Sequence, residues 1–240
     1  MTGNMQHPNV RRSVIALVFC LLSGGALGAP QPITDLPLQA EGDQQWRLPA
    51  GQYRGSFSID QPMTLTCAPD AVFQGQGEGN GVIIRAPNVR IQGCTFLDWG
   101  HDLTAMNAAV FIQPVAQGTV VRGNRMQGQG FGIWVDGTRD VSLIDNRIQG
   151  DPSLRSQDRG NGIHLYAVHG ARVIGNQVRE TRDGIYIDTS NGNLLQGNVL
   201  KDLRYGVHYM FANDNRLLDN VTRRTRTGCL LYTSPSPRDS

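Results

Sequence analysis

A 22-residue repeat constrains the fold of this chain more than any other feature. Its first marker is a series of asparagines, each preceded by a short apolar run, at spacings of 22, 30, 22 and 22 residues. They are Asn124, Asn146, Asn176, Asn198 and Asn220. Its second marker is a glycine that opens a Gly-[Ile/Val]-x-hydrophobic stretch, at Gly132, Gly162, Gly184 and Gly206. Two markers with one shared period predict a stacked-repeat architecture.

The composition of each repeat predicts the kind of stack. Every unit holds three short runs of alternating apolar residues, separated by Gly, Asn, Asp or Thr turns, and none has helical periodicity. The leucine-rich-repeat template is absent from the sequence. We therefore predict an all-β fold, a parallel β-helix with three-strand coils of about 22 residues. Equivalent asparagines would stack about 4.8 Å apart and form an amide ladder, which is a structural role.

The amino-terminal 28 residues have the pattern of a signal peptide. Arg11 and Arg12 precede an apolar run over residues 13–22, and small residues precede a cleavage point near Gly28/Ala29. The apolar run is too short for a comfortable membrane span. We expect an exported, periplasmic protein.

The remaining residues divide into three segments. Residues 29–45 are rich in Pro and Gln and are expected to be a leader. Residues 46–228 are the expected β-helix, as the amino-terminal part of a longer domain. Residues 229–240 lack the next repeat asparagine and resemble translated vector sequence, so we expect a non-native tail. Two insertions, 97–107 and eight residues near 150–161, should bulge from the stack.

Charge and cysteine content limit the function classes. The formal charge is +2, and no basic stripe with interleaved aromatic residues occurs, so nucleic acid is not an expected partner. When Leu65 is aligned with Ile91, Cys67 lies beside Cys94 in the adjoining coil. The pair fits either a disulfide or two buried thiols, and a two-thiolate metal site is the least favoured alternative.

Large side chains occupy the variable position of the Gly-[Ile/Val]-x-hydrophobic stretch. Because its neighbours are aliphatic and face inward, this position should face outward. The residues there are Trp134, His164, Tyr186 and His208. Two residues further along the same face are Asp136, Tyr166, Asp188 and Met210. We expect an exposed strip, used either for recognition or simply as a solvent-exposed ladder.

The strip contains candidate metal ligands. His208 and Met210 would lie roughly 7 Å apart on one face, and imidazole with thioether suits copper, Cu(I) in particular. His164 lies two coils away and cannot easily share that ion. His101 and Met106 form a second His/Met pair in the first bulge.

A polysaccharide-binding or polysaccharide-cleaving β-helix is the alternative. Asp136 and Asp188 are candidate acid and base, with Asp183 nearby. At two coils apart, roughly 10 Å, their carboxylates would be at the outer limit for an inverting pair. The clustered Asp-Asp and Gly-His-Gly triplets of pectin hydrolases are absent. This alternative is less favoured than copper handling.

Four segments of the sequence carry a family resemblance, of which the most specific is LRYGVHYMFANDNRLLDN (203–220). The others are DGIYIDTSN (183–191), WGHDLTAMNAAVFI (99–112) and LPAGQYRGSFSIDQPMTL (48–65). These segments resemble the NosD family of accessory proteins for nitrous oxide reductase maturation. The resemblance implies a right-handed parallel β-helix in the periplasm. It also implies work with the membrane and ATPase subunits of an ABC transporter and with a copper-chaperone lipoprotein, to build the copper–sulfur centres of nitrous oxide reductase.

The resemblance makes a non-catalytic copper-handling role the favoured interpretation. Copper would be bound transiently as Cu(I) and passed on by ligand exchange. The residues that match the family's His-Tyr-Met run are His208, Tyr209 and Met210. The full set of candidate metal ligands is His208, Met210, His101, Met106 and His164. A sulfur-transfer or scaffold role without direct metal binding is an alternative within the same pathway.

Overall fold

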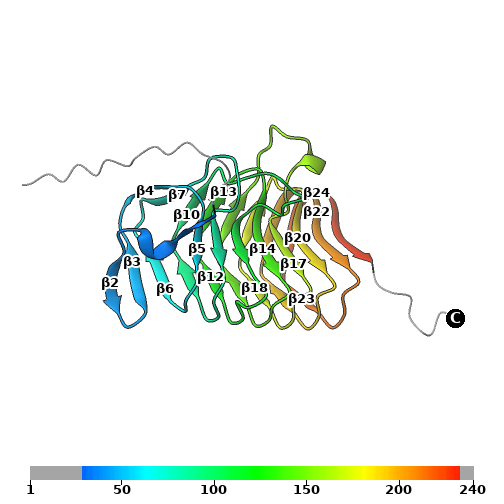
Figure 1. Ribbon diagram of the computed structural model, residues 1–240. Coiled ribbons are helices and arrows are strands. Elements are labelled where there is room, and N and C mark those ends of the chain that lie inside the picture. Colours follow the sequence, from blue (N-terminus) through cyan, green and yellow to red (C-terminus); the bar gives the residue numbers. More distant parts are fainter. Residues whose placement is uncertain (1–28, 233–240) are drawn as a thin grey trace, which may run out of the picture.

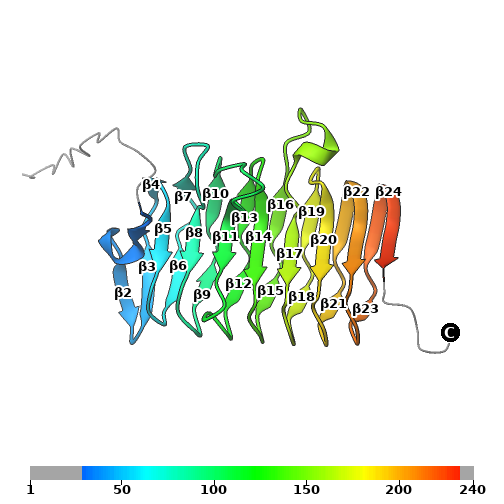
Figure 2. The same cartoon turned by 45° about the vertical axis from the view of Figure 1, so that its right-hand side comes forward.

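The chain forms a parallel β-helix of about nine coils, as predicted (Figure 1). The computed structural model describes residues 29–232, without the side chain of Tyr232. The expected signal peptide (1–28) and residues 233–240 of the expected tail lie outside this range. Strands of successive coils run side by side along the stack, and the two ends of the described chain lie at its opposite ends (Figure 2).

The strands stack into three sheet faces. Face 1 contains β1 (Gln31–Pro32), β5 (Phe57–Ile59), β8 (Val82–Ile84), β11 (Ala108–Ile112), β14 (Phe131–Asp136), β17 (Ile163–Tyr166) and β20 (Asp183–Asp188). Face 2 contains β2 (Gln39–Gly42), β3 (Gln45–Leu48), β6 (Thr64–Cys67), β9 (Arg90–Gln92), β12 (Val120–Arg122), β15 (Ser142–Ile144), β18 (Arg172–Ile174), β21 (Leu194–Gln196) and β23 (Arg216–Leu218). Face 3 contains β4 (Gly51–Arg54), β7 (Ala71–Gln74), β10 (Thr95–Leu97), β13 (Arg125–Gln127), β16 (Arg147–Gln149) and β19 (Gln177–Arg179). The last two coils run without a break from face 3 to face 1, as β22 (Val199–Met210) and β24 (Val221–Tyr232).

The repeating glycine is required by the distance between coils. A Cβ atom on Gly132, Gly162, Gly184 or Gly206 would collide with the carbonyl oxygen of the equivalent glycine in the next coil. The residue before each ladder asparagine has a different requirement, since its backbone adopts positive φ. Gly and Asp, which tolerate this conformation, occupy these sites, for example Gly123 (φ 63°) and Asp145 (φ 55°).

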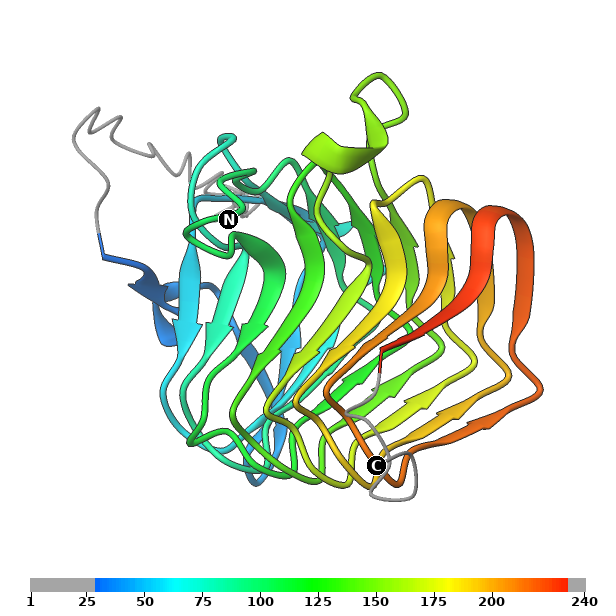
Figure 3. The same ribbon diagram turned by 90° about the vertical axis from the view of Figure 1, so that its right-hand side faces the viewer.

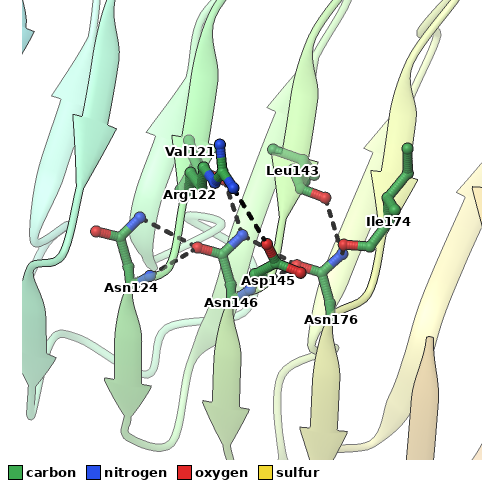
Figure 4. Close-up of polar contacts among 8 residues, drawn as sticks. All are labelled: Val121, Arg122, Asn124, Leu143, Asp145, Asn146, Ile174 and Asn176. Carbon is green, nitrogen blue, oxygen red and sulfur yellow. Dashed lines mark hydrogen bonds and ion pairs between the residues drawn. The ribbon is translucent and has the colours of Figure 1, made fainter. Parts of the chain in front are cut away.

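The asparagine ladder forms as predicted (Figure 4). The Oδ1 atom of Asn146 accepts hydrogen bonds from the backbone N and Nδ2 of Asn124, both at 3.1 Å. Its Nδ2 atom donates to the carbonyl of Val121 and to Oδ1 of Asn176, at 2.9 and 3.0 Å. A second, shorter ladder that we did not predict joins Asn193 and Asn215. The ladders hydrogen-bond buried turn amides that the strands leave unpaired.

Two of the four cysteines, Cys67 and Cys94, form a disulfide. Leu65 pairs with Ile91, the alignment expected from the sequence, and Cys67 is bonded to Cys94. Cys94 occupies the first position of the asparagine column, where its backbone N donates to Oδ1 of Asn124. The cross-link therefore joins the irregular first coils to the regular ones.

Both insertions leave the stack as expected. Residues 98–107 connect β10 to β11, and residues 150–162, with the 3-10 turn Ser156–Asp158, project beyond the coils (Figure 3). The segment expected as a leader takes part in the fold. Its 3-10 turn, Ile33–Asp35, buries Ile33, and β2 pairs antiparallel with β3. None of the helices within residues 29–232 is long and apolar enough to cross a membrane.

Candidate functional site

The outward-facing column on face 1 is a continuous stack of aromatic and imidazole rings. Strand register aligns Trp134, His164, Tyr186 and His208. Their ring centroids are 3.9, 4.6 and 4.3 Å apart in that order. The column was predicted, but the expectation that it is exposed was wrong. Trp134, His164 and His208 are only 7%, 8% and 9% exposed.

A second row of side chains covers the column. It lies three residues before each ring and consists of Phe131, Asn161, Asp183 and Tyr205. Phe131 packs edge-on against Trp134 at 4.8 Å, and Tyr205 packs edge-on against His208 at 5.0 Å. Leu103, from the 98–107 loop, packs against the cluster formed by Ala108, Phe131 and Trp134. Trp134, His164 and His208 are therefore covered by their own coils and one insertion, whereas Tyr186 is partly exposed.

Asp183 anchors the last histidine of the column. This carboxylate is fully buried and lies 2.9 Å from Nδ1 of His208. Arg204 donates to it from two nitrogens, at 2.9 Å to Oδ1 and 2.6 Å to Oδ2. Burial raises the pKa of Asp183, but the hydrogen bonds from His208 and Arg204 and their charges outweigh it and hold this pKa below its usual value. Asp183 is consequently an ionised acceptor.

The Asp183 contact determines which imidazole nitrogen of His208 is available. Because an ionised carboxylate only accepts hydrogen bonds, Nδ1 of His208 carries the proton. In the neutral ring, Nε2 then has a lone pair. A histidine held in this way by a carboxylate is the arrangement in which Nε2 binds metal ions.

Met210 lies next to His208 on the outer face. It is two residues further along β22, so its Cα atom is roughly 7 Å from that of His208. Strand register places it over Asp188, and its side chain is partly exposed. The structure thus brings His208 and Met210 to one outer face of β22, where Leu230 of β24 lies in register with His208. Within residues 29–232, no three His, Cys, Asp or Glu side chains converge on a possible metal position.

His164 lies inside the column rather than beside His208. Tyr186 separates the two imidazoles. The Nδ1 atom of His164 lies 3.2 Å from the side-chain amide nitrogen of Asn161. The Nε2 atom of His164 is buried and has no hydrogen-bond partner among the described residues. Burial lowers the pKa of His164 from 6.5 to about 3; the charge of Asp183 opposes this shift, and those of His208 and Arg182 add to it. His164 is therefore neutral at physiological pH.

His101 and Met106 are exposed on the 98–107 loop, whose Leu103 packs against the column. His101 lines a groove of about 390 Å³ between this loop and the start of the second insertion, together with Asp98, Trp99 and Asp151. Met106 is at the end of the loop with a φ of 56°. The structure does not bring this pair together with His208 and Met210.

The two carboxylates of the polysaccharide alternative occupy equivalent positions two coils apart. Asp136 pairs in register with Tyr166, which pairs with Asp188. Burial raises the pKa of Asp136, whereas Asp183 is held by Arg204 and His208. The roles of Asp183 and Arg204 as partners of His208 were not predicted. The sequence signal that could have indicated this role is that Asp183 is the one carboxylate at a position held by an aromatic or amide side chain in the neighbouring coils.

Comparison with known proteins places the chain in a family. A family model described as "Periplasmic copper-binding protein (NosD)" matches residues 144–236. A "Probable ABC transporter binding protein NosD" from Pseudomonas aeruginosa is 52% identical over 95 residues, which are 40% of this chain and 87% of that relative. The chain belongs to the NosD family. The resemblance seen in the sequence is thereby confirmed.

Two longer NosD relatives carry the same printed name. The one from Stutzerimonas stutzeri is 62% identical over 173 residues, covering 72% of this chain and 40% of the relative. The one from Pseudomonas aeruginosa strain PAO1 is 50% identical over 167 residues, covering 70% of this chain and 39% of the relative. The chain thus spans about two fifths of the length of these two NosD proteins.

A solved structure outside the NosD family has the same fold. The alginate lyase from Paenibacillus sp. str. FPU-7 superposes with a TM-score of 0.65 at 16% identity, covering 75% of this chain and 69% of the lyase. At this identity the likeness concerns the fold alone.

Proposed function

We propose that this chain is a periplasmic copper-handling protein that works with an ABC transporter in assembling the copper–sulfur centres of nitrous oxide reductase. Membership of the NosD family supports the copper and transporter parts of this proposal, through the names that the family model and the relatives carry. The buried Cys67–Cys94 disulfide supports export to an oxidising compartment. The role is delivery of an ion rather than catalysis.

The observation that carries the proposal is the Asp183–His208 pair beside Met210. Asp183 directs the lone pair of His208 to Nε2, and Met210 supplies a thioether on the same face. Imidazole and thioether are ligands that suit copper, and the thioether favours Cu(I). We therefore assign His208 and Met210 as the primary copper ligands, with copper as cargo.

A site with two protein ligands suits transfer. A closed set of four ligands would hold the ion, whereas open positions allow an incoming donor to displace one ligand at a time. Copper-chaperone lipoprotein and nitrous oxide reductase are the proposed donor and acceptor. His101 and Met106 are a second, loop-borne candidate pair. His164, neutral and buried in the ring stack, orients the column and would bind copper only if that column opened.

An anaerobic Cu(I) titration against a chromophoric competitor tests the proposal. We expect His208→Ala/Met210→Ala to weaken binding at least tenfold, because both ligands are lost. The matched control, His101→Ala/Met106→Ala, also removes one imidazole and one thioether but leaves the column intact. If the loop variant loses binding and the strand variant keeps it, the site assignment is wrong. If the unaltered chain does not bind Cu(I), direct copper handling is wrong, and a scaffold role replaces it.

A further inference from the structure

Face 3 carries a basic groove on its outer surface, away from the ring column. The groove has a volume of about 370 Å³ and crosses β13, β16, β19 and the start of β22. Its lining contains four cationic side chains and no carboxylate. The cations are Arg125, Arg147, Arg179 and Lys201. Its position and its charge set it apart from the His208 site.

Two of these cations are stacked without a counter-ion. Arg125 and Arg147 pair in register on adjacent strands, and both are exposed. Neither side chain has a hydrogen bond or an ion pair to any residue in the described range 29–232. Like charges directly opposite each other on neighbouring strands are destabilising. An arrangement that costs stability in the free chain indicates an anionic binding partner.

Two carboxylates beside the groove already have other hydrogen-bond donors. Asp202 lies 3.8 Å from Lys201 but is held by two hydrogen bonds from Arg224. Glu180 accepts a hydrogen bond from Gln149, and Gln149 in turn accepts one from Arg179 at 2.6 Å. Most of the positive charge of the groove is therefore available to an external ligand.

The spacing of the cations indicates what kind of ligand fits. They lie on four successive coils, about 4.8 Å apart, and shift by two residues along the strand between β16 and β19. On an α-helix, side chains at i, i+4 and i+7 lie on one face and advance about 5 Å per step. In an extended strand, side chains on one face are about 6.7 Å apart. A helix that crosses the coils obliquely therefore matches the cations better than a strand does.

The end of the groove is apolar. Val199 lines it, and Val221 pairs with Val199 in the next coil. Both side chains are 40% exposed. Exposed valines beside the cations suit a polypeptide with apolar as well as acidic side chains better than a uronic acid chain, whose substituents are mostly hydroxyls and carboxylates. We propose that this groove docks an acidic amphipathic α-helix of a partner protein, with its carboxylates over the four cations and an apolar side chain on Val199.

Binding of a synthetic peptide to the metal-free chain tests the docking site independently of copper. The probe is a fluorescent alanine-based helical peptide with glutamates at i, i+4, i+7 and i+11 and a leucine at one end of that face. A peptide of the same composition with the glutamates distributed around the helix is the control. In anisotropy measurements at low salt, we expect the first peptide to bind at least about tenfold more tightly and to be weakened by added salt.

Charge-removal variants locate the binding site. Arg125→Gln/Arg147→Gln is expected to weaken binding about tenfold, whereas Arg90→Gln/Arg172→Gln, which removes the same charge from face 2, should leave binding unchanged. Equal binding of the two peptides, or equal effects of the two variants, would overturn the proposal. If an oligogalacturonate binds more tightly than the peptide and depends on the same arginines, the ligand is a sugar chain and the helix proposal is wrong.

Discussion

At the scale of single residues, the candidate copper site depends on one buried carboxylate. Asp183 accepts a hydrogen bond from Nδ1 of His208 and two more from the Nε and Nη2 atoms of Arg204. An ionised group with no exposure needs such partners, because burying an unpaired charge is costly. The arrangement leaves His208 with a fixed ring orientation and an available Nε2.

Replacing Asp183 by asparagine should reverse the tautomer of His208. The amide has one acceptor oxygen, which Arg204 takes, and its NH2 group then donates to Nδ1. We expect 15N NMR of the metal-free protein to show the proton on Nε2, and Cu(I) affinity to fall about 10–100-fold. Asp188→Asn, at the half-buried carboxylate that pairs in register with Met210, is the control. An unchanged tautomer would refute the role given to Asp183, whatever the copper result.

His164 should make the fold sensitive to mild acid. Its pKa is lowered from 6.5 to about 3, so its contribution to stability is complete above pH 6.5 and is lost as the pH falls towards 3. The loss is about 1.4 kcal/mol per pH unit, or about 2 kcal/mol between pH 7 and 5. Urea unfolding at these two pH values should show this difference, and His164→Phe, which keeps the ring stack, should remove it. If replacing the exposed His169 by Gln removes the difference in unfolding free energy between pH 7 and 5 to the same extent, the assignment of this difference to His164 is wrong.

At the scale of the repeating elements, the asparagine ladder connects each turn to the next. An interior asparagine both donates to and accepts from its neighbours, so removing one breaks hydrogen bonds to the coils on both sides. The terminal member, Asn220, is half-buried and has no ladder neighbour beyond it among the described residues. Position within the ladder should therefore determine how much each asparagine contributes.

Asn146→Ala should cost more stability than Asn220→Ala. Loss of the interior side chain removes the acceptor of the Asn124 backbone N and one hydrogen bond each from Asn124 Nδ2, Asn176 Oδ1 and the Val121 carbonyl, at roughly 1–3 kcal/mol per buried group left unpaired. We expect the free energy of unfolding to fall by about 2–4 kcal/mol for Asn146→Ala and by about 1 kcal/mol for Asn220→Ala. Equal losses in chemical denaturation would contradict a cooperative ladder.

The disulfide joins two adjacent coils covalently, whereas the asparagine ladder joins coils by hydrogen bonds. It closes a loop across a sequence separation of 27 residues, for which chain entropy predicts roughly 3–4 kcal/mol. Cys67→Ala/Cys94→Ala should lower the free energy of unfolding by about that amount, measured without reductant. Cys229→Ala, which removes an unpaired cysteine, is the control. If the double variant is as stable as the control, the cross-link has no stabilising role.

At the scale of the whole molecule, the sequence was sufficient for the stack but not for the site. Each ladder asparagine and each repeat glycine interacts with its own equivalent in the next coil, so a period of 22 residues predicts both the contact and the fold. The burial of Trp134 depends instead on Leu103, from an insertion, and that of His164 on Phe131, from a covering row whose residue types do not repeat. The Asp183–His208 contact likewise joins two different positions of adjacent coils, which periodicity does not relate.

X-ray absorption at the copper edge tests the central claim most directly. We expect Cu(I) bound to the chain to show nitrogen scattering from His208 together with a sulfur scatterer from Met210. In Met210→Leu, which keeps the size of the side chain, the sulfur shell should disappear while a nitrogen shell remains. A first shell of nitrogen and oxygen alone in the unaltered chain, or a sulfur shell that survives Met210→Leu, would contradict the account.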